Sequence, residues 1–223
     1  MFRLLHLAAA EGELSAELAL CAFVDESEAM RLLVELADGG SSEAQFILAG
    51  FYRDGQGVPL DETQAALLYR MAADQGHIES QYQLGLVLRT GNGVPRDQLE
   101  GMRRLTQAAE GGHRQAQMTL GEAYQHSDAY RNPSEAIRWY RMAAEQGHPG
   151  AQFALAARFE RGEGVPRNTV TAHMWYNIAH SQGSYASEKT IERIESGMTR
   201  EQIFEAQALA TQCYNSDYKD CGW

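Results

Sequence analysis

The sequence predicts an all-α protein, a right-handed α-α superhelix built from antiparallel helix pairs. Three sets of markers recur every 35 or 36 residues in a common register: a Gly-His pair, an Ala-Gln or Ser-Gln pair, and a Gly-x-Gly-Val-Pro loop. Repetition at such a period is typical of a solenoid, in which each repeat packs against its neighbours. The sets begin at Gly76, Gly112 and Gly147; at Ala44, Ser80, Ala116 and Ala151; and at Gly55, Gly91 and Gly162.

Each repeat contains the signals of two helices. Apolar residues in 44–52 recur at three- and four-residue spacing, which predicts the first helix. Gly55 ends that helix, and the residue before Pro59 is driven to an extended conformation. Asp61, followed three residues later by Gln, predicts the cap of the second helix, and Gly76 stands where a left-handed residue ends it. Since no stretch alternates convincingly with period two, strands are not expected.

The repeat motif resembles the Sel1-like repeat (SLR), a relative of the tetratricopeptide helix pair. The matching residues are Ala-Gln-x-x-Leu-Gly-x-x-Tyr-x-x-Gly-x-Gly-Val-Pro-x-Asp and, at the end of the unit, Tyr-Arg-Met-Ala-Ala-x-Gln-Gly-His. The resemblance spans residues 13–183 and implies five helix pairs. Their expected bounds are 13–40, 41–76, 77–112, 113–147 and 148–183.

Both ends of the chain depart from the regular repeat. Residues 1–12 resemble the second helix of a repeat, so we expect either an N-terminal capping helix there, or a partial repeat of a longer precursor inside which the sequence begins, rather than a signal peptide. Residues 184–212 are expected to form two C-terminal capping helices, over 184–195 and 199–213, followed by a tail over 213–223. Thr199 and Gln202 form a capping-box pattern at the start of the second of these helices.

The charge balance argues against two classes of partner. Lys and Arg total 19 against 30 Asp and Glu, a formal net charge of −11. A nucleic-acid binder needs a basic face, so no nucleic-acid partner is expected. No apolar run approaches the ~18 residues of a membrane-spanning helix, so no membrane insertion is expected.

Catalytic and metal-binding patterns are weak in this sequence. His77, His113 and His148 occupy one turn position in successive repeats, which would place them ~10 Å apart, too far for one metal ion. We therefore expect turn residues and no metal site. Glu192 and Glu195 are expected to be solvated charges. Nucleophile-elbow, zinc-protease and Cys-x-x-Cys motifs do not occur, so the sequence indicates a non-enzyme without a cofactor.

The analogy with tetratricopeptide repeats places a binding surface on the concave face lined by the first helices. One row on that face is large and apolar or aromatic in each of four repeats, and the charged residues beside it differ between repeats. The row could consist of anchors for a partner, or it could pack between neighbouring repeats. The predicted binding residues are Phe46, Arg53, Tyr82, Leu86, Arg89, Met118, Glu122, His126, Phe153 and Arg161.

The resemblance implies a non-catalytic adaptor or scaffold whose partner is another protein. Bacterial relatives include immunity proteins that neutralise secreted effectors such as phospholipases, so a toxin or effector is one candidate partner. An alternative is an enzyme acting on cell wall or β-lactams, as proposed for cysteine-rich relatives. A purely structural oligomerisation module is another. We expect a monomer or a weak dimer.

Two cysteines bear on the compartment. Cys213 and Cys221 flank a turn-forming segment of the tail, and a chain folds back easily over eight residues, so we predict a disulfide. Cys21 is expected to be a buried free thiol. A structural disulfide implies an oxidising compartment and therefore a periplasmic or secreted protein. The alternative is two free thiols on a cytoplasmic tail.

Overall fold

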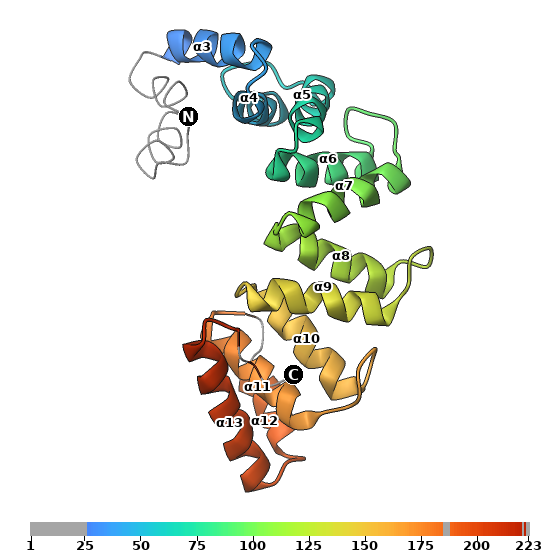
Figure 1. The fold of residues 1–223 in the computed structure, drawn as a ribbon, viewed down its shortest axis with the longest axis vertical. Helices are drawn as coiled ribbons and strands as arrows, with labels where there is room; N and C mark the ends of the chain where they lie inside the picture. The colour runs from blue at the N-terminus through green and yellow to red at the C-terminus, as the bar shows by residue number, and fades with distance from the viewer. Residues whose placement is uncertain (1–25, 185–187, 220, 222–223) are drawn as a thin grey trace. The chain divides into compact units, whose positions relative to one another are not determined.

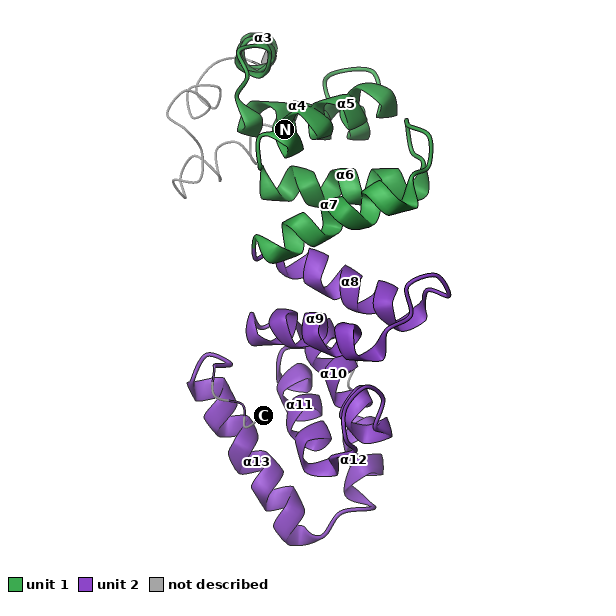
Figure 2. Cartoon of the chain, turned by 45° about the vertical axis from the view of Figure 1, so that its right-hand side comes forward, with its two compact units in different colours: residues 1–111 green, residues 112–223 purple. Residues whose placement is uncertain are grey.

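A computed structural model of the protein describes residues 26–184, 188–219 and 221, and within these ranges all regular secondary structure is helical (Figure 1). The all-α prediction is confirmed. The expected capping helix over 1–12, the start of the pair over 13–40, and Cys21 lie outside the described residues. The chain forms two compact units, residues 1–111 and 112–223 (Figure 2).

The described part of the first unit contains two complete helix pairs and one preceding helix. Helices that follow one another in the chain pack together, as a helix-pair solenoid requires. The helices are α3 (Glu26–Asp38), α4 (Ser42–Asp54), α5 (Glu62–Asp74), α6 (Ile78–Thr90) and α7 (Gln98–Glu110).

In the second unit, two helix pairs are followed by two C-terminal helices that both pack on α11. The helices are α8 (Arg114–His126), α9 (Pro133–Glu145), α10 (Pro149–Arg161), α11 (Thr169–Ser181), α12 (Glu188–Glu195) and α13 (Arg200–Asn215). The capping box predicted for Thr199 and Gln202 is present at the start of α13.

The second helix of each pair begins at a side-chain cap. Asp61 accepts hydrogen bonds from the backbone N–H groups of Thr63 and Gln64, both at 3.0 Å. Asp97, Asn132 and Asn168 accept the equivalent bond in the later repeats. These bonds satisfy donors that the first helical turn leaves without an intrahelical partner.

A histidine caps the first helix of three repeats. The Nδ1 atoms of His77, His113 and His148 each accept a hydrogen bond from the backbone N–H three residues later, at 3.2, 3.0 and 3.2 Å. Ser41 supplies the same bond to α4 through its hydroxyl, at 3.3 Å. The sequence indicated turn residues at these positions, and the structure gives them this specific bond.

Buried glutamines join successive helix pairs. Gln45 donates from Nε2 to the Ala37 carbonyl at 3.0 Å and accepts at Oε1 from Gln75 at 2.8 Å. Equivalent amide pairs join Gln117 to Gln146 and Gln152 to Gln182. The Gln of the Ala-Gln marker therefore has two contacts: its bond to the carbonyl eight residues earlier connects it with the preceding helix pair, and its amide pair connects it with the end of the second helix of its own pair.

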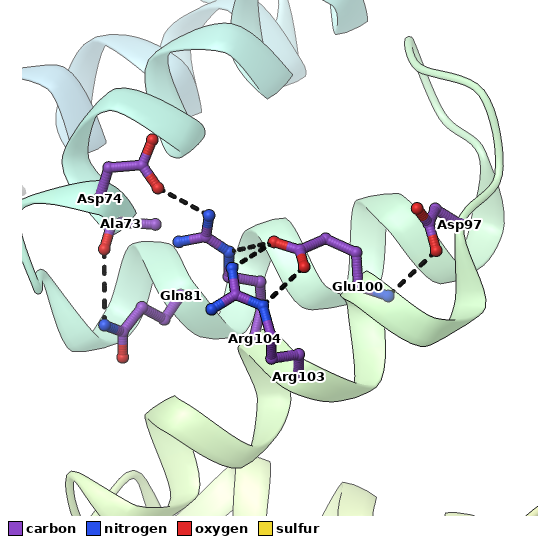
Figure 3. Close-up of polar contacts among 7 residues, drawn as sticks. All are labelled: Ala73, Asp74, Gln81, Asp97, Glu100, Arg103 and Arg104. Atoms are coloured by element: carbon purple, nitrogen blue, oxygen red, sulfur yellow. Dashed lines mark hydrogen bonds and ion pairs between the residues drawn. The ribbon is translucent and has the colours of Figure 1, made fainter.

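Charged side chains also connect helices in the first unit (Figure 3). Arg104 of α7 lies 2.6 Å from a carboxylate oxygen of Asp74 on α5, and its Nε donates to Glu100 at 2.7 Å. Arg103 donates two further bonds to Glu100. Hydrogen bonds from Arg103 and Arg104 lower the pKa of Glu100 to about 2, so this carboxylate stays ionised.

The tail folds back onto the second unit. Cys213 and Cys221 are both buried and form a disulfide across a Cα–Cα distance of 4.4 Å, the pairing that the sequence predicted. Within the loop that they close, the Tyr218 hydroxyl accepts a hydrogen bond from Gln182 at 3.0 Å. The Tyr218 ring lies so close to Gly147 that a Cβ there would sit 3.0 Å from it. The closed loop thus fixes one aromatic side chain against two inter-helix turns.

Candidate interaction face

The candidate face lies on the first helix of each pair. Side chains three and four residues apart share one side of a helix, so each helix presents its own set. The ten predicted residues are distributed as follows: Phe46 and Arg53 on α4; Tyr82, Leu86 and Arg89 on α6; Met118, Glu122 and His126 on α8; Phe153 and Arg161 on α10.

The aromatic row packs inward and remains partly exposed. The Phe46 ring centroid lies 6.0 Å from that of Tyr69, and the Phe153 ring centroid lies 5.3 Å from that of Tyr176, the equivalent pair three repeats later in the second unit. Phe46, Phe153 and Met118 are half-buried and packed against the core. The row therefore packs within its own repeat and also against the start of the next one, as Phe46 does with His77 and Met118 with Gly150, and it keeps an accessible edge.

In the first unit, α4 and α6 contribute neighbouring parts of this face. The Phe46 ring on α4 lies 5.0 Å from the imidazole of His77, which caps α6. Burial lowers the pKa of His77, while Glu43 and Glu79 oppose that shift. The imidazole is thus favoured in its neutral form, the form whose Nδ1 can accept the cap bond.

Arg53 is held in place by groups of its own unit. Its guanidinium donates to Asp54 at 2.7 and 2.9 Å and to the Tyr69 hydroxyl at 3.3 Å. Hydrogen bonding to Arg53 lowers the pKa of Asp54, and burial raises the pKa of Tyr69. The positive charge of Arg53 is therefore largely compensated within the protein.

In the second unit the polar residues of the face are more acidic. Glu122, His126 and Arg161 are exposed, and Arg161 lies 3.9 Å from Glu163. Glu160 of α10 pairs with Arg193 of α12, and this hydrogen bonding lowers the pKa of the Glu160 carboxyl. The C-terminal helices thus reach the end of α10.

One buried polar pair was missed by the sequence analysis. His173 is fully buried, and its Nε2 lies 2.7 Å from a carboxylate oxygen of Glu195. Asn177 hydrogen-bonds to the other ring nitrogen at 2.9 Å. The expectation that Glu195 is a solvated charge is wrong, because this carboxylate ties α12 to α11. A histidine on the buried side of a helix was the one available signal for a polar partner.

The described residues hold no group of three or more His, Cys, Asp or Glu side chains arranged to bind a metal ion. Among the described helices, none is both long enough and apolar enough to cross a membrane.

The comparisons with known proteins agree with the repeat architecture. Four consecutive segments match the family model described as Sel1 repeat, over residues 42–77, 78–113, 114–148 and 149–184. The chain belongs to the Sel1 repeat family. Each matched segment of this Sel1 repeat protein holds one complete helix pair, from α4–α5 to α10–α11.

Solved Sel1 repeat proteins share the fold. A Sel1 repeat protein from Oxalobacter formigenes is 29% identical, with a TM-score of 0.73, over 86% of this chain and 58% of its own. The protective antigen c5321 of uropathogenic Escherichia coli, which displays an SLR fold, is 29% identical, with a TM-score of 0.79, over 97% of this chain and 49% of its own. This chain spans about half the length of these two proteins.

A more distant likeness concerns the fold alone. The immunity protein PA5088 from Pseudomonas aeruginosa is 19% identical, with a TM-score of 0.51, over 97% of this chain and 82% of its own. No curated protein matches this chain in sequence.

Proposed function

We propose that this Sel1 repeat protein is a non-catalytic scaffold that binds a partner protein through the faces that the first helices present within each of its two units. The observation that carries the proposal is the half-buried row of Phe46, Tyr82, Met118 and Phe153. Aromatic and methionine side chains are enriched in the cores of protein interfaces. Inward packing also holds such side chains in place before a partner arrives, which reduces the entropy lost on binding.

The finer part of the proposal concerns the partner and the compartment. We propose that the protein acts outside the cytoplasm and that its partner is a secreted effector, a phospholipase for example, which it neutralises as an immunity protein. The Cys213–Cys221 disulfide supports the location, because disulfides persist in oxidising compartments. The net charge of −11 favours encounter with a basic partner surface.

The test is affinity capture from the native host with the wild-type chain and two variants. Tyr82→Ala truncates the row, and Leu67→Ala truncates an exposed apolar side chain of α5, away from the row. We expect Tyr82→Ala to weaken partner binding by about 2 kcal/mol, as for an interface hot spot, with a nearly unchanged thermal melt. The Leu67→Ala chain should bind as the wild type does.

Two results would contradict the proposal. If Tyr82→Ala lowers the melting temperature steeply, the row is core rather than interface. If Leu67→Ala loses the partner while Tyr82→Ala keeps it, a different face makes the contact.

A further inference from the structure

The structure distinguishes one arginine on the candidate face from the residues at the same position in the other repeats. This position holds Arg53, Arg89, Gln125 and Glu160 in successive repeats. Arg53 is paired with Asp54, Gln125 donates to Glu163 at 3.5 Å, and Glu160 is paired with Arg193. Within the described part of the chain, Arg89 has no hydrogen bond or ion pair through its side chain.

Two substitutions in its repeat account for the missing partners of Arg89. Arg53 is held by the carboxylate of Asp54 and the hydroxyl of Tyr69. The equivalent residues beside Arg89 are Thr90 and Leu105. The Thr90 hydroxyl donates to backbone carbonyls of α6, and leucine has no polar group to offer. Among the residues that the structure describes, no side chain therefore compensates the positive charge of Arg89.

A third substitution fixes the stem of this side chain. Gly101 of α7 lies against Arg89, and a Cβ at Gly101 would sit 2.7 Å from the Arg89 Cγ. The other repeats carry alanine at the position of Gly101, namely Ala65, Ala136 and Ala172. Because Arg89 is half-buried with its stem between α6 and α7, less side-chain freedom remains to be lost on binding.

The surroundings of the guanidinium suit an anion with an apolar neighbour. Tyr82 and Leu86 lie seven and three residues earlier on α6, on the same helix side, and both are half-buried. The acidic residue next to Gly101 is Glu100, which Arg103 and Arg104 already neutralise. A planar guanidinium matches a carboxylate in a two-point hydrogen bond.

We propose that Arg89 receives a carboxylate of the partner protein, an Asp or Glu side chain that stands beside an apolar residue packing on Tyr82 and Leu86. This inference rests on the proposed function and adds the chemistry that the partner must present. The overall negative charge of the chain attracts a basic partner, while Arg89 selects the one acidic side chain that fixes its register.

The experiment is an NMR titration of the full chain with ¹⁵N-labelled arginine, which follows the Nε–Hε signals. The probes are N-acetyl-glutamyl-leucinamide, its glutaminyl counterpart, and inorganic phosphate. The Arg89 signal is assigned by its loss in Arg89→Lys, and the matched control is Arg138→Gln, which removes an exposed arginine of α9 that is paired with Glu135. We expect the glutamyl peptide to shift the Arg89 signal saturably and to leave the Arg53 signal in place.

Variants sharpen the assignment. Arg89→Gln and Arg89→Lys should both weaken binding of the glutamyl peptide by about tenfold or more, because lysine cannot make the two-point bond. Arg138→Gln should leave binding unchanged, because Arg138 lies on α9 and outside the candidate face. A response to the glutaminyl peptide, an equal shift of the Arg53 signal, or tighter binding of phosphate than of the carboxylate would each overturn the inference.

The outcome is separable from that of the proposed function. If the glutamyl peptide does not shift the Arg89 signal while Tyr82→Ala weakens partner capture, the carboxylate site is wrong and the proposed protein-binding function is retained. If Tyr82→Ala does not change partner capture, the proposed binding face is contradicted, even when the peptide shifts the Arg89 signal.

Discussion

Helices α5 and α11 carry apolar side chains at the same repeat positions but differ in what covers them. Leu67 and Met71 of α5 are 50% and 40% exposed, whereas Met174 and Ile178 of α11 are 0% and 3% exposed. In the second unit α11 packs against α12 and α13, and its two residues share a buried cluster with Ile194 of α12. The repeat pattern therefore specifies a helix and its place in the pair, while the following elements decide whether its other side becomes core.

The largest expected effect tests the comparison directly. Met174→Ala should lower the free energy of unfolding by about 2–5 kcal/mol, because it opens a cavity in a fully packed site. Leu67→Ala at the equivalent position of α5 should change it by no more than about 0.5 kcal/mol. Urea denaturation of both variants under non-reducing conditions makes the measurement. A Leu67→Ala loss as large as that of Met174→Ala would mean that the α5 side is also covered.

A second prediction concerns the covalent link that only the second unit has among the described residues. Replacing both Cys213 and Cys221 by serine should cost about 2–3 kcal/mol, from the smaller entropy of the unfolded chain with a closed loop, and should release Tyr218 from Gln182. Hydrogen exchange should rise in α11 and α13 and stay unchanged in α5.

The state of the thiols in the native protein provides the control. Mass spectrometry of the unreduced chain should find a peptide that joins Cys213 to Cys221. If both thiols are instead freely alkylated, the Cys213–Cys221 disulfide is absent from the native protein, and the argument for an oxidising compartment fails with it.

The smallest expected effect is a pH dependence that both units share. His77 and His148 accept the cap bond at Nδ1 and so must be neutral, and burial is the main cause that lowers the pKa of each. Because the folded-state pKa lies below the unfolded one, the stabilisation is complete above about pH 6.5, the unfolded pKa. It is lost as pH falls through the folded pKa. Each cap should contribute about 1 kcal/mol.

Serine is the matched replacement, since Ser41 caps α4 in this way within the same chain. His77→Ser and His148→Ser should each flatten part of the loss of stability between about pH 7 and pH 5. Thermal melts across that range measure it. If the melting temperature of each variant falls with pH in parallel with that of the wild type, the imidazoles of His77 and His148 do not cause the pH dependence of stability.

Much of the fold followed from local signals. The caps at Asp61 and Thr199 were predictable because each acts on backbone groups within three residues. Glycines such as Gly76, with φ of 89°, mark turns for the same local reason. The repeat register put the ten candidate residues on the first helices of the pairs, where they lie in the structure. The sequence showed that Asp54 stands beside Arg53, but it could not show that the Tyr69 hydroxyl, 16 residues further on, also contacts this guanidinium.

The sequence by itself determined the period, the helix pairs from residue 42 onward, the caps at Asp61 and Thr199 and the Cys213–Cys221 pairing, because these depend on short-range hydrogen bonds and on spacing along the chain. Only the tertiary structure decided which side chains lose contact with water. It buried His173 against Glu195, covered Met174 but left Leu67 exposed, and separated Arg89 from any partner among the described residues. The physical reason is that burial and ion pairing depend on groups brought together from distant repeats, and identical repeat positions meet different neighbours.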